Sequence, residues 1–306
     1  MENKIEKLPD SYEVALLDPR PNADNSKIFE GKKVYGIEVT IPALAEKCEL
    51  GNLDPQHTGG DSTRAAIQDA ISVELPPEDA TLVTVRPDLD ALGSMAVFNI
   101  RRGTELSKET LEKVEKIAEM DTFSKGGWPG ERELPTKENP WPEGKSELNS
   151  LNALSSDFKI PVTERVERIK QWLINNIIPV DYDEKLDKER LDLANALESG
   201  QIKIDVEDGI AKIETTHRAG MDIGYRRAPV VIALNPRFQV QGGEPHTKYT
   251  VAQYSIGNVD LKSALEELKT KEEGWGGSPT IIGSPQGVSS KLSMDDVFEI
   301  VKKYKK

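Results

Sequence analysis

Two aspartates separated by a single residue, Asp88 and Asp90, follow a short apolar run at residues 82–85. Residues two positions apart in an extended segment point to the same side, so both carboxylates can converge on one cation. Open α/β sheets bind their ligands in this position, just beyond the carboxyl end of a strand. The alternative is that one aspartate caps a helix that begins near Ala91 while the other is solvated. Spacing alone slightly favours this alternative, so other segments must decide.

A second pair of candidate ligands, Asp54 and His57, lies in the dense polar segment of residues 51–61. Glycines in this segment let the backbone approach a ligand closely. An imidazole together with carboxylates suits manganese, iron or zinc, whereas an all-oxygen set would favour magnesium or calcium. A surface turn with a solvated histidine is the alternative. The other two histidines, His217 and His246, are predicted to be loop residues.

A third candidate ligand, Asp121, directly follows an amphipathic helix predicted over residues 105–120. The helix dipole disfavours a carboxylate at this end, which indicates a compensating cation, with a plain turn as the alternative. Lys125, Gly126 and Gly127 come next in the chain. Backbone N–H groups of such glycines can cradle a phosphate, although a surface turn is the simpler explanation by itself.

Composition limits the classes of protein to which this chain can belong. With 306 residues, the chain is long enough for two domains, each with its own core. Its net charge of -13 argues against non-specific binding to long nucleic acid, but not against a small anionic substrate. The single cysteine, Cys48, fits a reducing compartment. Residues 1–14 lack the apolar core of a signal peptide, and no apolar run approaches the roughly 20 residues of a membrane span. We therefore expect a cytoplasmic protein.

The candidate residues named so far lie within the first 200 residues, for which the sequence predicts a mixture of helices and strands. Residues 1–32 are predicted to be an irregular lead-in, and the proline-rich segment 121–148, which holds two tryptophans, is predicted to be a functional loop. Strands are predicted at residues 33–40 and 82–85. One or two helical turns are predicted at residues 42–48, a helix from Asp61 to the prolines at 76 and 77, and an apolar helix that begins near Ala91. Further helices are predicted at residues 105–120, 162–177 and 183–199.

From residue 201 onward, apolar and polar residues alternate, and Asp208 with Gly209 predicts a hairpin turn. Strands are predicted at residues 228–235 and 247–255, and helices at residues 261–271 and 294–304. Ser293 and Asp296 form an approximate capping box at the start of the last helix. We therefore predict an α/β protein of two domains with an active-site cleft between them. Residues 1–200 would form a mainly parallel sheet flanked by helices, and residues 201–306 a smaller α/β domain.

Taken together, these segments resemble the DHH phosphoesterase superfamily, the manganese-dependent phosphodiesterases and nanoRNases. Residues 86–94, Arg-Pro-Asp-Leu-Asp-Ala-Leu-Gly-Ser, are similar to the first motif of that family. Residues 54–57, Asp-Pro-Gln-His, look like a divergent form of its Asp-His-His motif, and Asp121 with Thr122 resembles its later Asp-Thr segment. Thr84 stands where the first motif has a metal-binding histidine. The Asp-His segment precedes the Asp-x-Asp segment here, the reverse of the family's order, so the resemblance implies a rearranged N-terminal domain.

The C-terminal half resembles the substrate-binding domain associated with that family. It shows the same succession of a strand, a Val-Asp pair, a helix, a glycine-rich loop, another strand and a final helix. Ser278 replaces the histidine of the glycine-rich loop, and Gln253 or Tyr254 stands where the family has a phosphate-binding arginine. The resemblance is specific around residues 86–94 and 274–285.

The resemblance implies a metal-dependent phosphoesterase that hydrolyses a small phosphodiester or phosphomonoester, such as a nucleotide or a short oligonucleotide. One or two divalent cations, manganese in the first place, would be held by Asp54, His57, Asp88, Asp90 and Asp121. The catalytic residues would be His57, Asp88 and Asp90, with Arg86 as a charge stabiliser. The phosphate would be bound by Gly276, Gly277, Ser278 and Lys125.

Two other interpretations stay open. The first is a catalytically inactive protein of the same fold that binds a nucleotide or a protein partner, which the missing histidines at Thr84 and Ser278 favour. The second is an unrelated, metal-independent protein in which the carboxylates are only caps and turns. Neither a membrane nor long nucleic acid is expected as a partner, and the sequence leaves a homodimer open.

Overall fold

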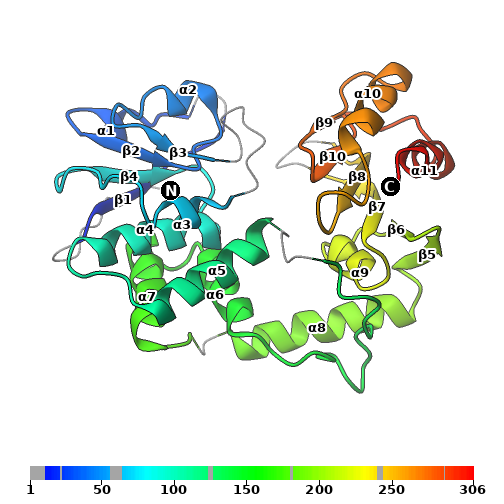
Figure 1. Cartoon of the computed structure of the whole chain (residues 1–306), viewed down its shortest axis with the longest axis horizontal. Coiled ribbons are helices and arrows are strands. Elements are labelled where there is room, and N and C mark those ends of the chain that lie inside the picture. Colours follow the sequence, from blue (N-terminus) through cyan, green and yellow to red (C-terminus); the bar gives the residue numbers. More distant parts are fainter. Residues whose placement is uncertain are drawn as a thin grey trace. The chain divides into compact units, whose positions relative to one another are not determined.

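The computed structural model of the chain describes residues 11–20, 23–55, 64–122, 127–179, 182–239, 244–285 and 287–306. The chain folds into two compact units (Figure 1), of which the first comprises Met1–Thr122 and Ser146–Asp183, and the second Phe123–Lys145 and Glu184–Lys306. This division differs from the predicted boundary near residue 200. The difference arises because Leu193, Trp128 and Leu134 pack against the core of the second unit.

The first unit contains a four-stranded sheet in the order β1-β4-β2-β3, and every neighbouring pair of strands is parallel. Its strands are β1 (Glu13–Leu16), β2 (Val34–Ile37), β3 (Asn52–Leu53) and β4 (Thr81–Thr84). All residues of β2 and β4 are buried, as expected for parallel strands covered on both faces. The predicted mainly parallel sheet is therefore confirmed. The prediction of an irregular lead-in was wrong, because β1 adds an edge strand to β4.

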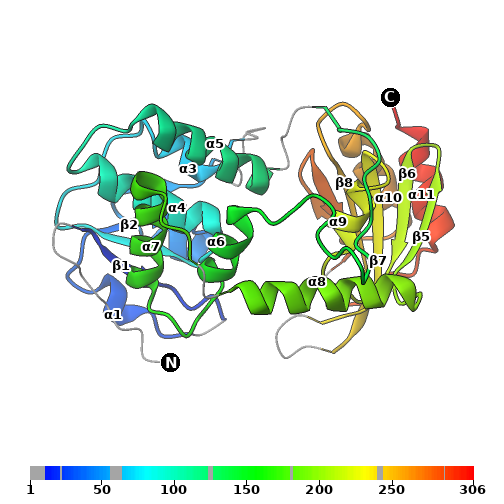
Figure 2. The same ribbon diagram turned by 90° about the horizontal axis from the view of Figure 1, so that it is seen from below.

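Helices cover both faces of this sheet (Figures 1 and 2). On one face lie α1 (Ser26–Phe29) and α2 (Pro42–Ala45). On the other lie α3 (Ala66–Asp69), α4 (Leu89–Arg101), α5 (Lys108–Thr122), α6 (Glu147–Ser155) and α7 (Val162–Asn175). Helix α4 is the central one, since every residue from Leu89 to Ile100 is buried. The sequence did not predict α6, which begins where the Ser146 side chain accepts a hydrogen bond from the Leu148 N–H.

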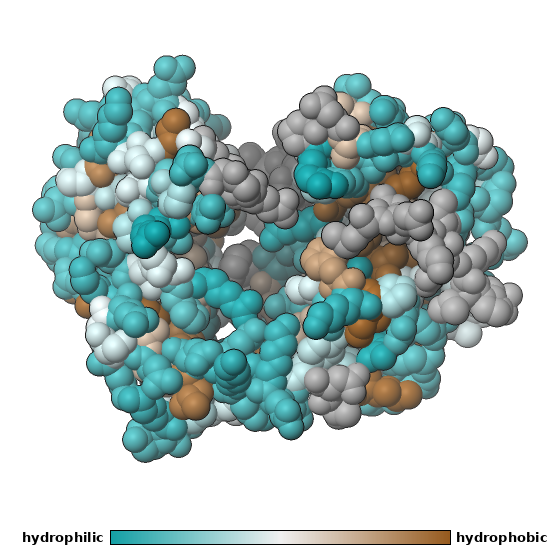
Figure 3. All heavy atoms as spheres, turned by 180° about the vertical axis from the view of Figure 1, so that it is seen from behind, coloured by the Kyte–Doolittle hydropathy of each residue, from teal (hydrophilic) through white to brown (hydrophobic). Residues whose placement is uncertain are grey.

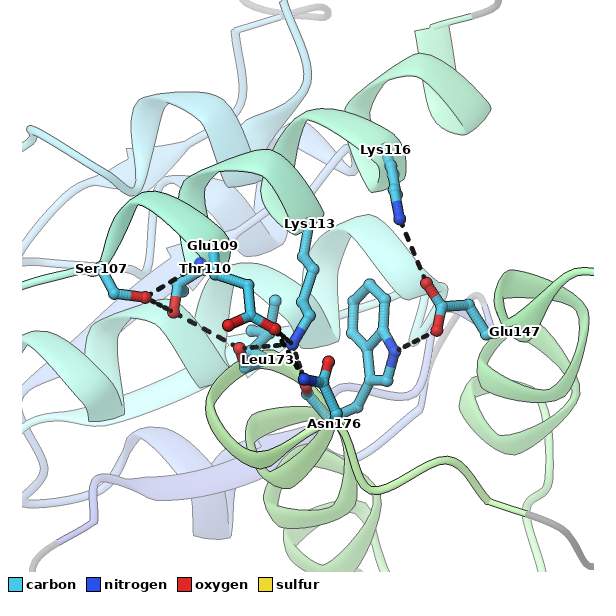
Figure 4. Close-up of polar contacts among 9 residues, drawn as sticks. Ser107, Glu109, Thr110, Lys113, Lys116, Glu147, Leu173 and Asn176 are labelled. Atoms are coloured by element: carbon cyan, nitrogen blue, oxygen red, sulfur yellow. Dashed lines mark hydrogen bonds and ion pairs between the residues drawn. The ribbon is translucent and has the colours of Figure 1, made fainter.

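A polar junction fastens α5 to the carboxyl end of α7 (Figure 4). The buried ammonium of Lys113 donates to the carbonyls of Trp172 (2.9 Å) and Leu173 (3.1 Å), two of the acceptors that a helix end leaves unpaired. Asn176, at φ 58°, ends α7 in the left-handed conformation, and its side chain donates to Glu109 of α5 (2.6 Å). The junction therefore fixes the helix that carries Asp121.

The second unit contains a six-stranded sheet in the order β5-β6-β7-β8-β10-β9, in which only β6 and β7 pair in parallel. Its strands are β5 (Lys203–Glu207), β6 (Ile210–Glu214), β7 (Val230–Phe238), β8 (His246–Gln253), β9 (Gly276–Gly277) and β10 (Ile281–Gly283). Asp208 and Gly209, at φ 49° and 70°, form the predicted hairpin turn between β5 and β6.

Two layers of helices pack on this sheet. Helices α10 (Leu261–Lys271) and α11 (Met294–Lys303) share one core with β7 and β8, and α8 (Asp183–Glu198) and α9 (Gly220–Tyr225) share the other. The predicted capping box of Ser293 and Asp296 is present at the start of α11. Helix α9 was not predicted. The two-domain α/β class is confirmed by these two sheets and their helices.

The tryptophan-containing segment 127–145 is fastened to the second unit. The Trp128 indole N–H donates to the Tyr225 carbonyl at the end of α9 (2.8 Å). The guanidinium of Arg226, which is buried, donates to the backbone of this segment and forms an ion pair with one of its glutamates (3.0 Å). The Trp141 indole N–H donates to Asp187 of α8 (2.7 Å). The predicted loop is thus a surface segment tied to α8 and α9 at several points.

Hydrophilic side chains dominate the face of the molecule shown in Figure 3, in keeping with a charged fraction of 30%. Among the residues that the structure describes, no helix is long and apolar enough to cross a membrane.

Candidate functional site

The carboxyl ends of β2, β3 and β4 bring acidic residues to one edge of the first sheet. Glu38 follows β2 directly, Asp54 follows β3 directly, and Asp88 lies four residues beyond β4. Because the three strands are parallel, their carboxyl ends meet at the same edge. Asp90, in the first turn of α4, and Asp121, in the last turn of α5, complete the set. We call these five residues the carboxylate cluster.

All four aspartates of the cluster act electrostatically on Glu38. Glu38 is buried, and its Oε2 atom has no hydrogen-bond partner within the described ranges. Burial, in the first place, and repulsion from the cluster's four aspartates together raise the pKa of Glu38 to about 10. The order of that repulsion, strongest first, is Asp90, Asp88, Asp121 and Asp54. The four aspartates proposed from the sequence therefore act on one carboxylate that the sequence analysis missed.

The backbone at Glu38 is unusual as well. Its φ of 51° is in the left-handed region, which a non-glycine residue occupies at an energetic cost of about 1 kcal/mol or more. Such strain persists where the surrounding structure imposes it, and it is frequent at functional sites. A polar residue interrupting the apolar run between Ile37 and Val39 was the available signal, but an alternating strand explains the same pattern.

Asp90 is held rigidly inside the cluster. Its two carboxylate oxygens accept hydrogen bonds from the N–H groups of Ala66 and Ile67, both at 2.8 Å. Asp90 is only 2% exposed, and burial together with the charge of Asp121 raises its pKa to about 7, against the lowering effect of those two hydrogen bonds. Asp90 thus joins the start of α3 to the start of α4 and is also part of a concentration of negative charge.

Asp88 performs the capping role that the sequence analysis gave as the alternative. Its Oδ1 accepts the Ala91 N–H (3.0 Å), and its Oδ2 lies 3.2 Å from Nε of Arg86. The side chain of Arg86 is otherwise open to solvent, at 78% exposure. Thr84, where the resemblance would place a histidine, is buried, and its hydroxyl exchanges hydrogen bonds with the backbone of Arg86 (3.2 Å). Thr84 therefore shapes the loop that presents Arg86 and Asp88.

Of the other residues predicted to bind metal or phosphate in the first half of the chain, two lie within the described residues and two do not. Asp54 is buried, and Asp121 lies in the last turn of α5, where the helix dipole disfavours a carboxylate. The compensating cation that the sequence predicted there stays a prediction. His57 and Lys125 lie outside the described residues. Nothing about these two residues enters the geometry of the cluster.

The donor chemistry of the cluster suits a hard divalent cation, which prefers carboxylate oxygens. Glu38 forms no ion pair with any described basic residue, and its buried Oε2 is the kind of orphaned acceptor that a cation would satisfy. Within the same described ranges, no three His, Cys, Asp or Glu side chains are arranged so that they could hold a metal ion together. The cluster is thus an electrostatic neighbourhood that fits a cation, and not an assembled coordination sphere.

The predicted phosphate-binding glycines lie in the β9–β10 hairpin of the second unit. Gly277 has φ 144°, and a Cβ there would stand 2.2 Å from the Ile281 carbonyl oxygen, so the hairpin itself requires this glycine. The Ser278 N–H donates to the same carbonyl (2.8 Å). Gly276 is exposed, and a side chain there would meet nothing within 4 Å. The buried Gln253, one of the two residues at which the resemblance would place an arginine, donates to the Pro279 carbonyl (2.7 Å) and so fixes the turn.

The two described histidines are explained by local structure. His246 is not a loop residue as predicted, but the first residue of β8, where its Nε2 accepts the Gly287 N–H (3.2 Å). His217 accepts the Ala219 N–H in a turn (3.1 Å), and burial lowers its pKa. Neither belongs to the carboxylate cluster.

Comparison with known proteins gives no family assignment. No protein-family model matches the chain, and no curated protein matches it. Among solved structures, it is similar to a pGpG-specific phosphodiesterase, PggH from Vibrio cholerae, at 14% identity and a TM-score of 0.41, over 89% of this chain and 96% of that one. It is similar also to an uncharacterized protein from Helicobacter pylori G27, at 11% identity and a TM-score of 0.20, over 89% of this chain and 98% of that one. Likenesses this low carry no argument about activity.

Proposed function

We propose that this protein is a metal-dependent phosphoesterase that hydrolyses a small phosphodiester or phosphomonoester, and that the carboxylate cluster is its metal site. The observation that carries the proposal is the buried Oε2 of Glu38, which has no hydrogen-bond partner in the described part of the chain and faces the charge of four aspartates. A buried carboxylate of this kind either takes up a proton or binds a cation. Since the cluster repels additional negative charge, a divalent cation is its natural ligand.

The residues that would hold one or two divalent cations are Glu38, Asp54, Asp88, Asp90 and Asp121, together with His57 from the sequence. Manganese is our first choice because an imidazole would join the carboxylates. These residues would position a cation that, when bound, would supply hydroxide near neutral pH by lowering the pKa of a coordinated water.

The protein's own groups have separate roles in this proposal. Asp90 is immobilised by its two backbone hydrogen bonds, and Asp88 is oriented by its cap on α4, so neither needs to reorganise on binding. Arg86 is exposed and adjoins Asp88, so its guanidinium can stabilise charge on a phosphate. Lys125, with the Gly276 to Ser278 loop, is proposed to bind phosphate. The acidic chain favours a small substrate over long nucleic acid.

A second candidate function is a catalytically inactive protein that binds a nucleotide. Thr84 favours this alternative, since its hydroxyl is engaged with the backbone of Arg86 and supplies no imidazole to the cluster. The two functions differ in turnover but not in cation binding.

The test begins with the full chain stripped of metal by a chelator. Retained manganese, magnesium, zinc and cobalt are then measured after dialysis, and hydrolysis of bis-p-nitrophenyl phosphate and of short oligonucleotides is assayed with each ion. Asp54→Asn and Asp121→Asn should lower activity by about 100-fold or more. Asp79→Asn, an exposed aspartate of the same unit, is the matched control and should leave activity unchanged.

Each outcome decides between the alternatives. Retention of a cation with turnover supports the phosphoesterase. Retention without turnover on any substrate supports the inactive binding protein. If no divalent cation is retained and none supports hydrolysis, the carboxylates are caps and turns, and the metal site does not exist.

A further inference from the structure

Lys248, on β8 of the second unit, is a buried cation without a charge partner. The residue is 9% exposed, and no carboxylate in the described ranges forms an ion pair with it. Its ammonium donates to the Ser284 carbonyl, although an ammonium carries three donors. Burial lowers the pKa of Lys248, and no neighbouring carboxylate opposes that effect.

Stability gives no reason for a lysine at this position. Burying an uncompensated ammonium is unfavourable, and an apolar side chain of similar length would pack there without that penalty. The other buried lysine among the described residues, Lys113, differs in this respect, since it caps two carbonyls of α7 and lies 3.3 Å from the carboxylate of Glu109. A buried ionisable group whose charge the protein does not compensate is a candidate functional residue.

Two glycines of the neighbouring strands lie beside Lys248. In the register of the sheet, Thr250 of β8 faces Gly283 of β10, and Gly283 in turn faces Gly276 of β9. Lys248 lies two residues from Thr250 and hence on the same face of the sheet. A Cβ at Gly283 would stand 3.3 Å from Nζ of Lys248, so the ammonium lies directly over this glycine.

The second glycine opens this surface to solvent. Gly276 is exposed, and a side chain there would meet nothing within 4 Å. Ile281, two residues before Gly283 and so on the same face, is 41% exposed. The patch therefore offers a buried cation at one side, the exposed backbone of Gly276 and an apolar side chain at its margin. An oxyanion can approach the backbone of Gly276 closely, since a glycine carries no side chain.

We propose that Lys248, Gly276 and Gly283 form an anion site, and that this site takes the phosphate group of a small phosphate ester. That the anion is a phosphate ester rests on the proposed function, whereas the existence of an anion site does not. The exposed Ile281 gives room for an apolar part of the ester beside the phosphate.

The experiment uses the full chain in chelator at constant ionic strength, so that metal makes no contribution. Binding of inorganic phosphate, adenosine 5′-monophosphate and adenosine is measured by calorimetry, and the midpoint of thermal unfolding is recorded with and without phosphate. Lys248→Met removes the charge and keeps the length of the side chain. Lys262→Met, an exposed lysine on α10, is the matched control. Gly283→Ala is a second variant that obstructs the ammonium without removing it.

We expect the wild type and Lys262→Met to bind phosphate and the monophosphate, but not adenosine. Lys248→Met should lose about tenfold or more in phosphate affinity, the usual effect of losing a charge-assisted hydrogen bond, and Gly283→Ala should lose affinity in the same direction. Without phosphate, Lys248→Met should unfold at a higher temperature than the wild type, because the uncompensated charge is gone. If Lys248 had only a structural role, Lys248→Met would unfold at a lower temperature than the wild type.

Failure of this inference is distinct from failure of the proposed function. Phosphate binding that Lys248→Met leaves unchanged, or a wild type that binds no phosphate, overturns the anion site whatever the result of the hydrolysis assay. If phosphate binding depends on Lys248 but the protein hydrolyses no substrate, the anion site is supported and only the proposed phosphoesterase activity is refuted.

Discussion

Replacing Glu38 by glutamine should stabilise the metal-free protein near neutral pH. Glutamine keeps the size of the side chain and removes the carboxylate that burial and four aspartates oppose. The pKa of Glu38 is raised in the folded state to about 10 from an ordinary value of 4.5. A group with a raised pKa adds its stability below the unfolded pKa and loses it as pH rises toward the folded pKa. The wild type is therefore penalised increasingly between pH 4.5 and 10.

The size of this effect at pH 7 follows from the same linkage. About two and a half pH units separate the ordinary pKa from pH 7, and each contributes about 1.4 kcal/mol, so the penalty is about 3.5 kcal/mol. Glu38→Gln should raise the free energy of unfolding of the first unit by up to that amount at pH 7. The gain should shrink to nearly zero at pH 4, where the carboxyl group is protonated in both states.

Urea unfolding in chelator, followed by hydrogen exchange of the β2 and β4 amides, reports on the first unit. Glu30→Gln, an exposed glutamate of the same unit, should change stability by less than about half a kcal/mol. Addition of manganese should stabilise the wild type more than Glu38→Gln, since only the carboxylate attracts the cation. A Glu38→Gln protein that is less stable than the wild type at pH 7 in chelator would refute the reasoning, because Glu38 would then be charged and paired.

Three further perturbations test the local structure. Asp90→Ala leaves two buried N–H groups at the start of α3 without acceptors and should destabilise the first unit by about 2 kcal/mol, as measured by urea unfolding. Gly277→Ala forces a Cβ to within 2.2 Å of a carbonyl oxygen and should speed hydrogen exchange in β10, whereas Gly276→Ala should change it little. Arg226→Met removes a backbone hydrogen bond and an ion pair to segment 127–145, so limited proteolysis should cut that segment faster than in the wild type. An unchanged cleavage rate would show that the tryptophans alone hold the segment.

Much of the fold could be predicted from the sequence because local signals agreed with the tertiary structure. The turn at Asp208 and Gly209, the cap at Ser293 and the apolar strand β4 each depend on a few neighbouring residues. Strand β1, helix α6 and helix α9 were missed for the opposite reason. They are short, and the partners that stabilise them, such as β4 for β1, are distant in the chain.

The sequence predicted those residues of the candidate site that local spacing reveals, and missed the one that only the tertiary structure brings to the site. Asp88 and Asp90 stand out because they lie close together after an apolar strand, and Asp121 because it opposes a helix dipole. Glu38 stands alone in its segment, and its place beside Asp90 depends on β2 pairing with β4 across more than forty residues. No local pattern contains that pairing. The assignment of all these residues to a metal is still a prediction.

The capping and the metal-binding interpretations of the aspartates are not exclusive, and the titration of Asp90 shows how they combine. Two backbone N–H groups that donate to a carboxylate stabilise its charged form and by themselves lower its pKa below the ordinary value. Asp90 accepts two such bonds at 2.8 Å, yet its pKa is raised to about 7. Burial and the charge of Asp121 therefore outweigh both hydrogen bonds. A helix cap alone would favour the ionised form of Asp90. The role of Asp90 as an anchor for α3 therefore does not explain its raised pKa. A cation at the cluster would reverse this balance, and the pKa of Asp90 should then fall on addition of manganese.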